Sequence, residues 1–156
     1  LKQKHTLGKI SFQSVIIADF GERLKSVLAS FTFADVSNKE VKFFTLNQWF
    51  DETLFNEEAF ENLIFPGIDL VNFNKFNKKY YNFFDTPAIE IAILAYDAMG
   101  LIYYQWGDKK SNFKVNQFSS EEGFKGLVGE FVIKNNASYQ KLKVYKISEK
   151  KFIEIN

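Results

Sequence analysis

The sequence predicts an α/β protein with a partly parallel open sheet, flanking helices and antiparallel strands near the C-terminus. Three observations predict this class. A continuous apolar run at residues 14–18 is typical of a buried strand, a segment with helical periodicity follows it, and a second apolar run occupies residues 41–46. Strand, helix and strand at this spacing form a βαβ unit, in which the two strands are parallel and the crossover is right-handed.

The first strand and helix are the clearest elements. Residues 14–18 contain Val-Ile-Ile, a run that favours a strand buried on both faces of a sheet. Asp19-Phe20-Gly21 interrupts the run. The next segment carries apolar residues at the i, i+3, i+4 and i+7 positions of a helix: Leu24, Val27, Leu28 and Phe31.

Further elements follow the βαβ unit. Residues 47–51 leave the second strand, and residues 63–65, stopped by Pro66-Gly67, form a plausible third strand. Residues 73–84 form a short amphipathic helix with aromatic residues on one side. Thr86-Pro87 predicts the start of another helix, because a hydroxyl N-cap followed by proline is a frequent helix beginning.

The helix after Pro87 is apolar around much of its circumference and must be covered on more than one side. Beyond it, strands are predicted at residues 127–134, 141–148 and 151–155. Asn135-Asn136 and Glu149-Lys150 supply the turns that join these strands.

Composition excludes several classes of function. The chain has 156 residues, about one domain, and its net charge of +1 gives no basis for nucleic-acid binding. It has no cysteine, so disulfides, a thiol nucleophile and a thiolate metal site are impossible. The best candidate for a membrane span, residues 87–106, contains Glu90, Asp97 and Gln105, and we interpret it as a buried helix.

The sequence contains few residues that could carry catalysis. His5 is the only histidine and lies in a polar N-terminal stretch, so we expect neither a histidine-based triad nor a metal site. Gly123, Gly126 and Gly129 resemble a phosphate-binding series, but a strand follows them where a helix should. We therefore expect turns at these glycines, and a protein that is not an enzyme and needs no cofactor.

The best candidate for recognition lies where two predicted strands end. Residues 47–51 offer the amide of Gln48, the indole of Trp49 and the carboxylate of Asp51 at one strand end, and Asp19-Phe20-Gly21 lies at the neighbouring end. Ligands of open α/β sheets bind at the carboxyl ends of strands. The alternative is that Trp49 and Phe50 simply cover the core.

The ordered features resemble the C-terminal half of type 1 periplasmic binding proteins, the fold of leucine/isoleucine/valine-binding proteins. The segments that carry the resemblance are residues 18–24, 33–36, 40–44, 48–52, 65–66, 87–98 and 123–131. Leu-Ala-Tyr-Asp-Ala at residues 94–98 and Gly-Phe-x-Gly-x-x-Gly-x-Phe at residues 123–131 are the most specific. Within the superfamily, the chain looks most similar to alphaproteobacterial penicillin-binding protein activators, which are envelope lipoproteins.

The resemblance implies two α/β lobes with a ligand between them. By analogy, residues 1 to about 85 would belong to the second lobe, residues 86–130 would return toward the first lobe, and residues 131–156 would be closing strands. The main sheet of the first lobe would be absent from this chain. The protein would lie in the periplasm or cell envelope, lipid-anchored in its full-length form.

The resemblance also implies a ligand-binding set. In amino-acid-binding relatives, the loop matching Phe20 supplies an aromatic contact, and the loop matching Gln48 supplies a carboxylate for the ligand's ammonium group. Gln48 is not an acid, and Asp51 is displaced by three residues. The expected ligand-binding residues are Asp19, Phe20, Gly21, Gln48, Trp49, Asp51 and Pro66.

Two functions remain open. The first is an activator-like envelope module that regulates peptidoglycan synthesis by contacting a penicillin-binding protein or another envelope protein. The second is a transport receptor that binds a branched-chain amino acid or a similar small solute. The neutral side chain at Gln48 favours the first function, because an amide cannot form the same charge-assisted pair as a carboxylate.

Overall fold

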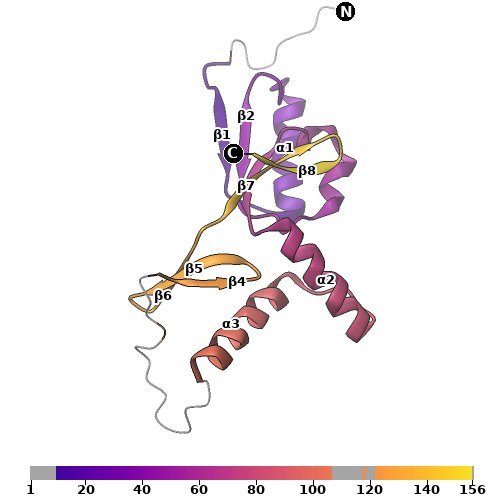
Figure 1. The fold of residues 1–156 in the computed structure, drawn as a ribbon. Helices are drawn as coiled ribbons and strands as arrows, with labels where there is room; N and C mark the ends of the chain where they lie inside the picture. Colours follow the sequence, from indigo (N-terminus) through magenta and orange to yellow (C-terminus); the bar gives the residue numbers. More distant parts are fainter. Residues whose placement is uncertain (1–9, 107–117, 119–121, 156) are drawn as a thin grey trace, which may run out of the picture. The chain divides into compact units, whose positions relative to one another are not determined.

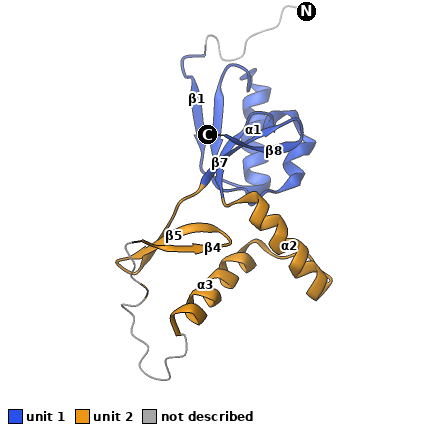
Figure 2. Ribbon diagram, viewed as in Figure 1, with its two compact units in different colours: residues 1–67, 143–156 blue, residues 68–142 orange. Residues whose placement is uncertain are grey.

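A computed structural model describes residues 10–106, 118 and 122–155. The chain divides into two compact units (Figure 2). Unit 1 consists of Leu1–Gly67 and Lys143–Asn156, and unit 2 consists of Ile68–Leu142. His5 lies outside the described residues.

Unit 1 is built on a five-stranded sheet with the order β1-β2-β3-β7-β8 (Figure 1). Its strands are β1 (Ser14–Ile17), β2 (Lys42–Thr45), β3 (Ile64–Gly67), β7 (Lys143–Ser148) and β8 (Lys151–Ile155). The first three are parallel, with Ser14 opposite Lys42 and Phe44 opposite Ile64, while β7 and β8 are antiparallel additions. The predicted βαβ unit and the predicted mixture of parallel and antiparallel strands are confirmed.

Helix α1 (Gly21–Phe33) connects β1 to β2. Leu24 and Leu28 are its buried residues, and the ring of Phe31 meets that of Phe43 on β2 edge to face, with centroids 5.3 Å apart. Gly21 has a φ of +60°, a conformation that glycine adopts without steric cost and that lets the chain turn directly from strand end into helix.

An aromatic cluster fills the core of unit 1. The ring of Phe50 lies 4.9 Å from that of Tyr145 and 5.4 Å from that of Phe152, centroid to centroid, and Phe65 also packs on Tyr145. Gly67 lies close against this cluster: a Cβ there would lie 3.1 Å from both Phe50 and Tyr145, so these rings would have to shift to admit a larger residue.

The two faces of the sheet differ. Ile17 is buried, whereas its neighbour Ile16 on the opposite face is 78% exposed, and Val144 and Ile153 are also exposed. The prediction that residues 14–18 form a strand buried on both faces is therefore wrong for the described structure. Sequence pattern cannot separate the two cases here, because both faces of the strand carry apolar residues.

Unit 2 contains α2 (Leu70–Phe84), α3 (Glu90–Trp106) and a three-stranded antiparallel sheet. The sheet consists of β4 (Phe124–Gly126), β5 (Gly129–Lys134) and β6 (Ala137–Gln140). Asn135 and Asn136 both have positive φ, as a two-residue hairpin turn requires, so the predicted turn is confirmed. The strand β6 was not predicted, because its sequence Ala-Ser-Tyr-Gln has no apolar alternation.

The predicted helix start at Thr86-Pro87 is wrong. Helix α2 continues to Phe84 and is capped by Asp85 in a left-handed conformation, so residues 85–89 are needed to turn the chain between two helices. Helix α3 begins at Glu90.

Much of α3 is uncovered within the described part of the chain. Ile93 is its buried residue, and its large exposed side chains are Ile91, Tyr96, Met99, Tyr103, Tyr104 and Trp106. Among the described residues, no helix is both long enough and apolar enough to cross a membrane.

Candidate functional site

The candidate site lies at the carboxyl ends of the parallel strands of unit 1. Since β1, β2 and β3 run in the same direction, their ends meet at one edge of the sheet. Asp19-Phe20-Gly21 follows β1, the segment from Asn47 to Asp51 follows β2, and Pro66 is the penultimate residue of β3. The structure thus brings the predicted residues to one edge, where they have different roles.

Two side chains from the end of β2 converge on the backbone at the end of β1. The hydroxyl of Thr45 lies 2.8 Å from the carbonyl oxygen of Asp19 and 2.9 Å from that of Ile17. The side-chain amide of Gln48 donates to the same Asp19 carbonyl at 3.1 Å. Both residues are buried, so these bonds fix the exit of β1 relative to β2.

The hydrogen bonds of Thr45 and Gln48 to the end of β1 form what we call the strand-end framework, and Gln48 makes further bonds within it. Its Nε2 also lies 3.0 Å from the carbonyl oxygen of Leu46 and 3.3 Å from the hydroxyl of Thr45, and the residue is only 5% exposed. Sequence reasoning missed Thr45 altogether. The available signal was a polar residue at the same inward-facing parity as the buried Phe43, since a buried hydroxyl must be hydrogen-bonded.

Asp19 and Phe20 lie at the surface that this framework holds. Asp19 is partly exposed, and its Oδ1 accepts the backbone N–H of Phe20 at 2.9 Å. Phe20 is the N-cap residue of α1 and is 66% exposed, a large fraction for a phenylalanine. A carboxylate and an accessible aromatic ring are therefore carried by successive residues at the end of β1.

Trp49 and Phe50 differ. Both adopt left-handed backbone conformations, with φ of +50° and +58°, which direct Phe50 into the aromatic core. For Phe50, the alternative reading of the sequence, that it covers the core, is confirmed. Trp49 is partly exposed, and its backbone N–H donates to the side-chain oxygen of Asn47 at 2.9 Å.

Asp51 acts as a helix cap. Its carboxylate accepts the N–H of Thr53 at 2.9 Å, which begins the short helix η1 (Glu52–Asn56). Lys25 on α1 lies in its field: the pKa of Lys25 is raised, mainly by a hydrogen bond to Glu22 and to a smaller extent by the charges of Asp51 and Glu57.

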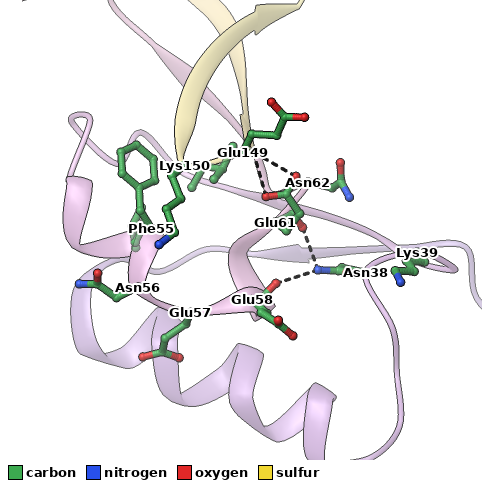
Figure 3. A pocket seen from close by; sticks show the side chains of 12 residues that line it. Asn38, Lys39, Phe55, Asn56, Glu57, Glu58, Glu61, Asn62, Glu149 and Lys150 are labelled. Carbon is green, nitrogen blue, oxygen red and sulfur yellow. Dashed lines mark hydrogen bonds between the residues drawn. The ribbon is translucent and has the colours of Figure 1, made fainter.

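A surface pocket lies at the opposite end of the sheet from this edge. This pocket of about 590 Å³ lies where β2 and β3 begin and β7 ends (Figure 3). Its lining includes two lysines and four glutamates: Lys39, Lys150, Glu57, Glu58, Glu61 and Glu149.

The polar groups of this pocket hold its own walls together. The side-chain amide of Asn38 donates to the carbonyl oxygens of Glu58 and Glu61, each at 3.0 Å. The carboxylate of Glu61 accepts the hydroxyl of Ser148 at 2.9 Å. It also accepts the backbone N–H of Glu149 at 3.2 Å (Figure 3). Among the described residues, no group of three acidic or histidine side chains is arranged to hold a metal ion. The residues that the sequence singles out lie at the strand-end edge instead, which is therefore the candidate site.

Comparison with known proteins identifies the fold. No protein-family model matches this sequence, and no curated protein matches it either. Solved structures do match. An ABC transporter substrate-binding protein from Desulfitobacterium hafniense aligns with 92% of this chain at 14% identity and a TM-score of 0.65.

Two further solved structures show the same likeness. A complex of such a Desulfitobacterium hafniense protein with Leu has a TM-score of 0.63 at 13% identity, and the leucine-binding protein LivK from Thermotoga maritima has 0.60 at 13% identity. Both alignments cover 92% of this chain and 43% of the other protein, so this chain spans less than half of the length of these neighbours. The likeness shows a partial type 1 periplasmic binding protein fold, which agrees with the sequence resemblance at the level of the fold alone.

Proposed function

We propose that this chain is part of a non-catalytic binding protein of the cell envelope, and that it binds a small amino-acid-like solute at the carboxyl ends of β1 and β2. The observation that carries the proposal is that Asp19 and the exposed Phe20 follow each other at a strand end whose backbone is held by Thr45 and Gln48. Ligands of open α/β sheets bind at this edge. The structural neighbours include a leucine-binding protein and a complex with Leu.

The larger organisation belongs to the same proposal. Residues 1 to about 85 would contribute to the second lobe, residues 86–130 to the return toward the first lobe, and residues 131–156 to the closing strands. The protein would act in the periplasm, with a lipid anchor in its full-length form, and would deliver its solute to a membrane permease.

The experiment is calorimetry of the full-length protein with the twenty amino acids and with small peptides. Micromolar binding of an amino acid, accompanied by a negative heat-capacity change, is expected for a receptor that buries an apolar side chain. Absence of binding across the whole series would overturn the receptor proposal.

A second candidate is an activator-like module that contacts a penicillin-binding protein. The specific observation in its favour is that Gln48, a buried neutral amide, stands where amino-acid-binding relatives have the carboxylate that holds the ammonium group. Capture of a purified penicillin-binding protein by the full-length protein, with stimulation of its peptidoglycan synthesis and no amino-acid binding, would favour this candidate over the receptor.

A further inference from the structure

We propose that the surface pocket at the amino ends of β2 and β3 is a second binding site, and that it takes a short peptide with a free amino group and a free carboxylate. The pocket belongs to unit 1 and has a volume of about 590 Å³ (Figure 3). Pockets that hold small molecules commonly measure about 300–1,000 Å³. The inference goes beyond the proposed solute-binding function, because the pocket shares no residue with the strand-end edge.

Part of the lining builds the wall of the pocket and is not available to a ligand. The side-chain amide of Asn38 donates both of its hydrogens, to the carbonyl oxygens of Glu58 and Glu61. The two carboxylate oxygens of Glu61 accept the hydroxyl of Ser148 and the backbone N–H of Glu149. These bonds join the segments before β2 and β3 to the end of β7, so the pocket is formed before any ligand arrives.

The other charged side chains of the pocket have both signs and are not paired with one another. They are the exposed side chains of Glu57, Glu58, Glu149, Lys39 and Lys150. Within the described part of the chain, none of the five takes part in an ion pair or a side-chain hydrogen bond. A ligand with a single charge would be attracted by one set and repelled by the other, whereas a zwitterion can pair with both.

Apolar and amide groups lie among these charges. Leu54 is fully buried, Ile147 is 2% exposed, and both line the pocket beside the partly exposed ring of Phe55. Asn56 and Asn62 line it as well, and their side-chain amides form no hydrogen bond to the described residues. An amide has a donor and an acceptor, which match the C=O and N–H of a peptide bond. Peptide groups, apolar side chains and terminal charges thus each have a counterpart.

The turn at Glu149-Lys150 supports the inference independently. Both residues have positive φ, +50° and +57°, in the two-residue turn that joins β7 to β8. Such turns favour Asn, Asp and Gly, and the corresponding turn of unit 2 is Asn135-Asn136. Local conformation therefore does not explain a glutamate and a lysine here, although both line the pocket. Unfavourable backbone conformations of this kind cluster at functional sites. We assign Lys150 as the partner of the peptide's carboxylate.

The test uses the full-length protein and calorimetry with Ala-X-Ala tripeptides, in which X is each of the twenty amino acids. At least one free tripeptide is expected to bind, and more weakly at high salt, because exposed ion pairs are screened. Its N-acetylated and C-amidated form, which lacks both terminal charges, is expected to bind about fivefold more weakly or less tightly still. If no tripeptide of the series binds, or if the blocked form binds as tightly as the free one, the inference is wrong.

Two variants test the assigned charges. Lys150→Gly removes the ammonium group at a turn position that favours glycine, so we expect a midpoint of thermal unfolding no lower than that of the wild type and a loss of about fivefold or more in peptide affinity. The double variant Glu57→Gln, Glu58→Gln is expected to weaken binding to a similar extent. Lys151→Gln and Glu52→Gln are the matched controls, because both residues are exposed and do not line the pocket. Unchanged affinity in Lys150→Gly would overturn the inference without any question of folding.

The position of the bound peptide separates this inference from the proposed function. In NMR spectra, the tripeptide that binds most tightly should shift the backbone signals of Asn38, Phe55 and Lys150 and leave those of Asp19 and Phe20 in place. Shifts at Asp19 and Phe20 alone would put the peptide at the carboxyl ends of the strands and would overturn the inference while supporting the solute-binding function. Absence of amino-acid binding would reject that function and leave the pocket unaffected.

Discussion

The carboxylate of Asp97, in the middle of α3, accepts the backbone N–H of Val128 at 2.8 Å. Its other oxygen accepts the N–H of Leu127 at 2.9 Å. One side chain thus satisfies both donors of the turn that joins β4 to β5. This contact connects the two segments that carry the most specific resemblance in the sequence, the Leu-Ala-Tyr-Asp-Ala helix and the glycine-rich turn.

The first prediction follows from this contact. Asp97→Asn leaves a single side-chain oxygen for two N–H donors and removes the charge, so we expect the free energy of unfolding to fall by about 1.5–3 kcal/mol. Chemical denaturation measures the change, and hydrogen exchange should show faster exchange at Leu127 and Val128. Glu130→Gln is the matched control, because Glu130 is exposed. Equal stability of the two variants would contradict the assigned role of Asp97.

The second prediction compares two glycines of unit 2. A Cβ at Gly126 would collide with the carboxylate of Asp97, whereas a Cβ at Gly100 on α3 has nothing within 4 Å. We expect Gly126→Ala to destabilise the protein and to disrupt the Asp97 contact. Gly100→Ala should stabilise it by up to about 1 kcal/mol, because alanine is the better helix former. Thermal unfolding of both variants tests the contrast, which a loss of stability in Gly100→Ala would contradict.

The third prediction concerns the strand-end framework. Gln48→Leu is nearly isosteric but removes every hydrogen bond of the amide and leaves buried carbonyl oxygens with fewer donors. We expect a loss of about 1–3 kcal/mol in the free energy of unfolding. The same substitution at Gln13, which is exposed, should have little effect. If Gln48→Leu lowers the free energy of unfolding no more than Gln13→Leu does, the buried amide is dispensable for stability.

The fourth prediction tests the difference between the faces of the sheet. Ile16 and Ile17 are neighbours in β1, but only Ile17 is buried. In this 156-residue chain, Ile17→Ala should lower the free energy of unfolding by about 2–4 kcal/mol and Ile16→Ala by about 0.5 kcal/mol or less. Urea denaturation of the two variants provides the comparison, and equal losses would mean that both faces are covered in solution.

The fifth prediction concerns pH. Glu22 raises the pKa of Lys25 by accepting a hydrogen bond at 2.8 Å. Because the folded pKa is the higher one, this pair stabilises the protein below the ordinary lysine pKa of 10.5, and the contribution disappears as the pH rises through the raised value. Glu22→Gln should move the pKa of Lys25 downward in an NMR titration, while Glu52→Gln should leave it unchanged.

The local parts of the fold were predictable from the sequence, whereas the long-range contacts were not. Periodicity alone identified β1, α1 and β2, and turn chemistry identified the hairpin at Asn135-Asn136. Thr86-Pro87 carried a valid local signal for a helix start. The structure does not follow that signal. Helix α2 extends to Phe84, so residues 85–89 are used to turn the chain, and α3 begins only after them.

The site shows the same division. That Asp19, Phe20 and Gln48 gather at one edge follows from parallel strands, which the sequence predicts. The burial of Gln48 and the part played by Thr45 depend on hydrogen bonds to residues 26 to 29 positions away. No local pattern encodes such a pairing.

The sheet of unit 1 is completed by the end of the chain. Strand β3 pairs with β7, and the Tyr145 and Phe152 rings complete the aromatic cluster around Phe50 and Phe65, although all of unit 2 lies between β3 and β7 in sequence. During synthesis, the edge of β3 that pairs with β7 therefore stays unpaired until residues 143–148 have been made. We expect the closure of so long a loop to slow the folding of unit 1, because contacts between residues far apart in sequence form late.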